Sequence, residues 1–256
     1  MILVGTSGFS YDDWVGTVYP EGSTRRDFLR LYAARFPFVE LNFSYYRQPG
    51  AVMLERMLEA TPESFRFAIK AHQSLTHASG EDPAEPARIF REGITPLIES
   101  GRLEAVLCQF PYSFHYTPES RRHLDRVCGH LEGLPLAVEF RSHEWQRDSV
   151  YTGLRRRGAA FVNVDTPELP RLPRPSAVAT SDLGYVRFHG RNAGQWWRGS
   201  SASRYDYLYD SSELSGWVPL IASLSRQVKL LLVAFNNHYK GQAARNAGDL
   251  NLLLGL

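Results

Sequence analysis

The chain has 256 residues, of which 43% are hydrophobic and 22% charged, and a formal net charge of +2. This length suits one (β/α)8 barrel as well as two small domains, and the composition is that of a globular protein with a large core. The small net charge gives no support for duplex DNA binding, and no stretch reaches the ~18 apolar residues of a membrane helix.

Short apolar runs alternate with amphipathic segments along the whole chain. Eight runs have the length and composition of strands, at residues 2–5, 39–42, 65–71, 105–110, 136–141, 160–165, 185–190 and 230–235. Strand–helix alternation repeated eight times predicts parallel strands that close into a TIM-type barrel of the α/β class. No repeat, low-complexity tract or linker divides the chain, so we expect residues 1–256 to form a single domain.

The segments between the runs carry helix signals in all units but one. Thr24, followed three residues later by Asp27, approximates a capping box, and Pro118 suits the first turn of a helix. Residues 241–256 have the pattern of a closing amphipathic helix. The proline-rich segment 167–177 cannot form a regular helix, so we predict an extended loop in the sixth unit.

Polar side chains stand at the ends of most of these runs. They are Glu40, Asn42, Lys70, His72, Gln109, Glu139, Arg141, Asp165, Arg187, His189, Asn236 and Asn237. Because strand side chains alternate between two faces, we expect the charged face to line the barrel at its C-terminal mouth, where barrel active sites lie. Chains rarely bury so many titratable groups unless these pair or function. A self-satisfied salt-bridge network is the alternative, although such networks contribute little to stability.

Recognition of an anion fits this ring of residues best. Lys70, Arg141 and Arg187 would bind phosphate, and Glu139 would act as the acid or base. The remaining assignments give Asp165 and His189 as catalytic partners of Glu139, and Glu40, Asn42, His72, Gln109, Asn236, Asn237, Trp14 and Tyr46 as further substrate contacts. The last two represent loop aromatics that suit stacking on a base or sugar.

Three other chemistries compete with this interpretation. Carboxylates and histidines could bind a divalent metal, but the chain has no HxH or HExxH spacing and bases in the same ring would repel a cation. Glycoside hydrolysis would need a carboxyl pair such as Glu139 and Asp165. Schiff-base chemistry would use Lys70, for which a salt bridge to Glu40 or an anchoring role is simpler. Without a Walker loop or dinucleotide fingerprint, the sequence indicates no nucleotide cofactor.

Several long phrases resemble signatures of the YecE-like family, also called domain of unknown function 72. They are GTSGFSYDDWVGTVYP, FVELNFSYYRQP, FRFAIKAHQSLTH, VEFRSHEW, YVRFHGRN and AFNNHYKGQAARNA. The resemblance covers nearly the whole chain. It implies a TIM-type barrel and no established reaction, and a comparison of this family with barrel endonucleases is analogy only.

These observations together predict an enzyme that acts on a phosphate-bearing ligand, such as a nucleotide, a nucleic-acid end or a sugar phosphate. Hydrolysis or phosphodiester cleavage is the expected reaction class, and a non-catalytic barrel that binds single-stranded nucleic acid is the alternative. The N-terminus enters a strand at once without a targeting segment, so we expect a cytoplasmic protein with no membrane partner. Cys108 and Cys128 fit no disulfide or metal motif, which predicts buried free thiols.

Overall fold

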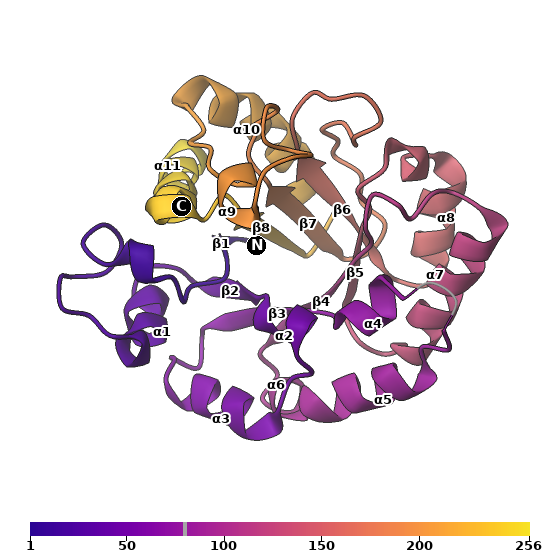
Figure 1. Ribbon diagram of the computed structural model, residues 1–256, viewed down its shortest axis with the longest axis horizontal. Helices are drawn as coiled ribbons and strands as arrows, with labels where there is room; N and C mark the ends of the chain where they lie inside the picture. Colours follow the sequence, from indigo (N-terminus) through magenta and orange to yellow (C-terminus); the bar gives the residue numbers. More distant parts are fainter. Residues whose placement is uncertain (79–80) are drawn as a thin grey trace.

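A computed structural model describes residues 1–78 and 81–256 of the chain. Eight parallel strands close into a barrel in chain order, and β1 pairs with β8 to complete it (Figure 1). The strands are β1 (Ile2–Ser7), β2 (Phe38–Leu41), β3 (Arg66–Lys70), β4 (Leu103–Gln109), β5 (Leu136–Glu139), β6 (Ala160–Asp165), β7 (Leu183–Phe188) and β8 (Leu230–Phe235). The predicted TIM-type barrel is confirmed.

Helices surround the barrel on its outside (Figure 1). The α-helices are α1 (Arg25–Ala33), α2 (Phe43–Tyr46), α3 (Ala51–Glu59), α4 (Gln73–Thr76), α5 (Ala84–Gly93), α6 (Thr95–Glu99), α7 (Pro118–His130), α8 (Asp148–Arg156), α9 (Ser201–Arg204), α10 (Ser211–Ser225) and α11 (Gln242–Leu254), with 3-10 turns η1 (Asp12–Trp14), η2 (His143–Trp145) and η3 (Tyr239–Gly241). The predicted start of α1 is confirmed, because the Asp27 carboxylate accepts a hydrogen bond from the Thr24 backbone N–H at 3.1 Å. Among the helices of the described residues, none is long and apolar enough to cross a membrane.

The sixth unit departs from the repeat as predicted, because residues 166–182, all of them described, contain no helix between β6 and β7. A buried side chain holds this connection against the barrel. Asn163 of β6 accepts hydrogen bonds through Oδ1 from Ser176 Oγ at 2.8 Å and from the Val178 backbone N–H at 2.9 Å. The proline-rich segment is therefore ordered by β6 without a helix of its own.

The barrel interior and the layer between barrel and helices form two separate apolar cores. The interior core consists of Phe38, Ala68, Ala105, Leu107, Ala137, Ala160, Val162, Val164, Tyr185, Leu232 and Ala234. Polar residues that follow these by two positions share their inward face at the C-terminal mouth. They are Glu40, Lys70, Gln109, Glu139, Arg187 and Asn236. The strands thus bring six of the predicted site residues to one end of the barrel.

Candidate active site at the barrel mouth

The deepest layer of the mouth is a buried ion-pair network centred on Arg187. Its Nε and Nη2 donate to the two carboxylate oxygens of Glu40 at 2.8 and 2.6 Å, and Nη2 also donates to Ser7 Oγ at 2.9 Å. Nη1 donates to Glu139, and Tyr185 donates to Glu40 at 2.6 Å. Burial disfavours the charged form of Arg187, but the carboxylates of Glu139 and Glu40 outweigh this effect and raise the pKa of the guanidinium. Every nitrogen of Arg187 and both oxygens of Glu40 thus have a partner within this layer, which agrees with the salt-bridge alternative.

Arg187 was expected to bind the substrate, and its surroundings do not favour that role. Each of its three nitrogens already donates to a protein oxygen, and the residue is 1% exposed. A ligand anion would have to displace Glu40 from a buried bidentate contact or Glu139 from its hydrogen bond with Nη1. Arg187 is therefore better described as the cation that holds these two carboxylates in place.

Glu139 lies among three cationic or donor groups. Arg187 binds one of its oxygens, while Arg141 Nε and His189 Nε2 lie 2.6 and 3.1 Å from Oε1. Burial would raise the pKa of this carboxyl, but the adjacent charges of Arg187 and Arg141 together with His189 hold it well below its usual range. Because Glu139 is fully buried and stays ionised, it is better suited to hold Arg141 in place than to act as the acid or base that the sequence predicted.

His189 connects this carboxylate to the end of β8. The amide nitrogen of Asn236 lies 3.1 Å from His189 Nδ1, and because an amide nitrogen only donates, Nδ1 accepts and Nε2 carries the proton toward Glu139. Burial and the charge of Arg141 lower the pKa of His189 to about 3. The imidazole therefore remains neutral in a fixed tautomer at physiological pH.

Lys70 lies in a second layer, above the ion-pair network. Its Nζ donates to the Gln109 side-chain oxygen at 2.8 Å and lies 4.2 Å from the centre of the Tyr45 ring. Burial lowers the pKa of Lys70 to about 7, assisted by the charges of Arg187 and Arg141 and opposed by the more weakly acting carboxylates. The mouth thus contains an amine that can gain or lose a proton near neutral pH.

A cavity of about 400 Å³ opens above Lys70 and Gln109. Its basic lining residues are Lys70, His77, Arg141 and Arg204, and its aromatic ones are Tyr45, Tyr46, Tyr112, Trp196, Trp197 and Tyr205. Among the described residues that line it, none is Asp or Glu. Burial, Lys70 and Arg141 lower the pKa of His77 to about 4, so the fixed positive charge of the lining comes from arginine.

The prediction that Asp165 belongs to this ring is wrong. Val162 and Val164 point into the barrel, so Asp165, one position further, points outward to the helices. Its two carboxylate oxygens accept four hydrogen bonds of 2.6 to 2.9 Å, two from Arg191 and one each from Tyr209 and Trp217. Asp165 therefore anchors the loop after β7 and the helix α10 outside the barrel.

Three predicted substrate contacts have local structural roles instead. Trp14 is fully buried and donates from Nε1 to the His238 carbonyl at 2.7 Å. Asn237 donates to Asn246 Oδ1 at 2.9 Å and so joins β8 to α11. His72 accepts the Ser74 backbone N–H at 3.3 Å as the N-cap of α4. Loop and cap packing accounts for these side chains.

The other predicted residues divide between the two layers. Lys70, Gln109, Arg141 and Tyr46 line the cavity, with Tyr46 73% exposed at its rim, while Glu40, Glu139, Arg187, His189 and Asn236 lie in the buried layer. Asn42 occupies the N-cap position of α2 without a capping bond from its side chain, and it does not line the cavity. Lys70, Gln109, Arg141 and Tyr46 are therefore the predicted substrate contacts that line the cavity.

Sequence reasoning missed several lining residues, among them His77, Arg204 and Tyr205. Arg204 ends α9 in the long aromatic loop after β7, and among the described residues its buried Nε has no hydrogen-bond partner. The density of aromatic residues in 196–209 was a signal for the loop as a whole. No spacing rule indicated which of its side chains would reach back over the mouth.

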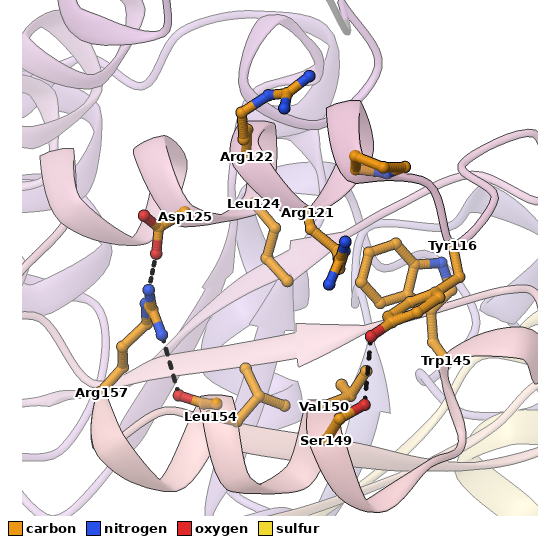
Figure 2. Close-up of a pocket in the computed structure, with 12 residues that line it drawn as sticks. Tyr116, Arg121, Arg122, Leu124, Asp125, Trp145, Ser149, Val150, Leu154 and Arg157 are labelled. Atoms are coloured by element: carbon orange, nitrogen blue, oxygen red, sulfur yellow. Dashed lines mark hydrogen bonds and ion pairs between the residues drawn. The ribbon is translucent and has the colours of Figure 1, made fainter.

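A second cavity of about 430 Å³ lies outside the barrel between α7 and α8 (Figure 2). There Arg157 pairs with Asp125 and donates to the Gly153 carbonyl at 3.1 Å, and the hydroxyls of Tyr116 and Ser149 are 3.2 Å apart. These polar groups satisfy one another across the groove. The mouth cavity, whose described lining includes Lys70, Arg141 and Arg204 and no Asp or Glu, is the better candidate site.

Comparison with known proteins agrees with this architecture. A family model described as "Protein of unknown function DUF72" matches residues 3–256. UPF0759 protein YunF of Bacillus subtilis (strain 168) is 32% identical over 273 residues, which cover 100% of this chain and 95% of that protein. Crystal structures of DUF72 family proteins from Thermotoga maritima MSB8 and Enterococcus faecalis V583 are 44% and 30% identical, with TM-scores of 0.94 and 0.88. Both alignments cover 100% of this chain, with 100% of the first structure's chain and 96% of the second's.

Proposed function

The chain belongs to the DUF72 family of proteins of unknown function, and we propose that its barrel mouth binds a phosphate-bearing ligand and acts on it as an enzyme. The composition of the cavity carries this proposal: Lys70, Arg141 and Arg204 line it, and none of the described lining residues is a carboxylate. Glu139 keeps Arg141 at the cavity floor, with Nε 2.6 Å from Oε1. Arginine is well suited to phosphate because its planar N–H groups can donate in pairs.

The aromatic lining favours a ligand that also presents a flat face. Trp197 and Tyr112 meet edge to face with ring centres 4.7 Å apart, as do Tyr45 and Tyr46 at 4.9 Å. Aromatic side chains beside arginine suit stacking on a nucleobase or a sugar ring. A nucleotide, a nucleic-acid end or a sugar phosphate meets both requirements.

The geometry supports Lys70 rather than Glu139 as the group that transfers protons. Glu139 is ionised and enclosed, whereas Lys70 faces the cavity with a pKa lowered to about 7 by burial and the nearby arginines. A group that titrates near the working pH is the most effective acid or base. Hydrolysis or phosphodiester cleavage remains the proposed reaction class, with Arg141 and Arg204 stabilising charge on the phosphate. Among the described residues no three His, Cys, Asp or Glu side chains gather as a metal site, so the proposal uses none.

Thermal-shift and calorimetric titrations test this proposal. We expect inorganic phosphate, nucleoside monophosphates and sugar phosphates to raise the melting temperature, because ligands that bind the folded state stabilise it. Arg204→Met should weaken phosphate binding by roughly tenfold, as expected for one charge-assisted hydrogen bond. Arg122→Met is the matched control, because Arg122 pairs with Glu119 on the exposed face of α7 at 2.8 Å. Equal affinity in both variants, or no shift with any phosphate, would overturn the proposal.

A non-catalytic barrel that binds single-stranded nucleic acid is the second candidate function. Two aromatic side chains at the cavity favour it, because Tyr46 and Trp197 are 73% and 52% exposed and available for base stacking. This function predicts oligonucleotide affinity that falls steeply with salt concentration and no turnover. Turnover of a small phosphorylated compound with weak oligonucleotide binding would exclude it.

A further inference from the structure

Lys70 combines features that a salt-bridged lysine does not have. Its amine donates to the neutral side-chain amide of Gln109 at 2.8 Å and lies over the Tyr45 ring, and the residue lines the mouth cavity. The simpler expectation, a salt bridge from Lys70 to Glu40, is not met, because both Glu40 oxygens accept hydrogen bonds from Arg187. The amine is therefore held at the cavity surface without a carboxylate to keep it protonated.

We propose that Lys70 is a nucleophile that forms an imine with the carbonyl carbon of a phosphorylated aldehyde or ketone bound in the mouth cavity. This inference rests on the phosphate binding of the proposed function, since the anion site would hold the phosphate while the carbonyl faces the amine. It gives Lys70 imine chemistry at the carbonyl carbon in place of the acid–base role in hydrolysis. It narrows the substrate class to phosphorylated carbonyl compounds, such as the open-chain form of a sugar phosphate.

The step balances without an oxidant, a reductant or a metal. The unprotonated Nζ of Lys70 attacks the carbonyl carbon, and one of its two hydrogens passes as a proton to the carbonyl oxygen to give a carbinolamine. Loss of that oxygen with both amine hydrogens as one water molecule leaves the C=N bond. Imine formation turns the carbonyl into an electron sink for bond cleavage or proton removal at the neighbouring carbon.

The charged groups around Lys70 favour the free amine. Arg141 and Arg187 oppose its protonation, and the carboxylates that would favour protonation, Glu139 and Glu40, are already neutralised by those arginines. Tyr45 faces the amine with its ring, and His77, also in the lining, remains neutral. Burial next to cationic groups is a known way to activate a lysine as a nucleophile.

The lysine content of the chain makes this proposal straightforward to test. Lys70, Lys229 and Lys240 are its only lysines, and the side chain of Lys229 is 83% exposed in a pair with Asp182. The intact protein is incubated at pH 7 with glyceraldehyde 3-phosphate or with glyceraldehyde, each with sodium cyanoborohydride, and the adducts are located by peptide mass mapping. A lysine of ordinary pKa has roughly one free amine in 3000 at this pH, whereas a pKa near 7 leaves about half free.

We expect glyceraldehyde 3-phosphate to label Lys70 at least ~10-fold faster than Lys229 or Lys240, and inorganic phosphate to protect Lys70. Lys70→Arg, which keeps the charge, should lose this adduct, and Lys240→Arg should keep it. Calorimetric binding of inorganic phosphate without preferential Lys70 labelling would overturn the imine and leave the proposed function standing. Equal labelling of Lys70 by the phosphorylated and unphosphorylated aldehydes would overturn the phosphorylated substrate class. Absence of both phosphate binding and Lys70 labelling would overturn both proposals.

Discussion

Replacing Arg187 with alanine is expected to destabilise the fold by about 3–5 kcal/mol, because it leaves two buried carboxylates without their common cation. Arg187 donates to both oxygens of Glu40 and also to Glu139, and all three residues are at most 1% exposed. Neither carboxylate can reach water without opening the barrel. Urea unfolding followed by circular dichroism measures the change in the free energy of unfolding.

The matched control for this experiment is the double variant Glu40→Gln, Arg187→Met. It removes one negative and one positive charge together, so it should lose less stability than Arg187→Ala alone. If Arg187→Ala unfolds at the same urea concentration as the wild type, the network does not hold the barrel mouth together. Greater loss in the double variant would lead to the same conclusion.

Lys70→Met is expected to stabilise the protein by about 2–4 kcal/mol at pH 7 and below. Burial and the neighbouring arginines lower the pKa of Lys70 from 10.5 to about 7, so between these values the unfolded chain binds more protons than the folded one. Wild-type stability should therefore rise with pH across this window, relative to the variant, and the advantage of the variant should vanish near pH 10.5. Urea titrations of the wild type and the variant from pH 6 to 10 measure this difference in the free energy of unfolding.

The two variants separate structural from functional residues at the same site. Arg187→Ala should cost stability, whereas Lys70→Met should increase stability and weaken phosphate binding. A residue retained at a cost in folding free energy is typical of a functional site. Loss of stability in Lys70→Met at pH 7 would mean that Lys70 belongs to the supporting network instead.

Strand alternation made much of the barrel mouth predictable. Because side chains of a strand alternate between its two faces, the sequence predicts an inward position for Glu40, Lys70, Glu139 and Arg187. The structure confirms this position for all four. The position of Asp165 at the end of an apolar run suggests the ring, but the same alternation turns its side chain outward, because Val164 before it points inward. A difference of one residue moves a side chain from the barrel interior to the helix layer.

The division of the mouth into two layers could not be derived from the sequence. From the sequence, a salt-bridge network and a functional pocket are alternatives for one ring of residues. The structure instead shows a buried ion-pair layer beneath a cavity whose lining includes Lys70, Arg141 and Arg204. Which arginine meets which carboxylate depends on neighbouring strands and their register. The roof of the cavity depends on Arg204 and Tyr205, which belong to a loop whose path no local pattern specifies.

We propose above that Lys70 is an amine without a carboxylate partner in a cavity that binds anions, and a nuclear magnetic resonance titration can measure both properties at once. With lysine labelled by carbon-13 at Cε, the three lysine signals can be followed with pH in the presence and absence of inorganic phosphate and assigned with Lys70→Arg. We expect a pKa near 7 for Lys70 in the free protein, which rises by about one unit or more when phosphate binds nearby. A Lys70 pKa at the ordinary value of 10.5, unchanged by phosphate, would contradict it.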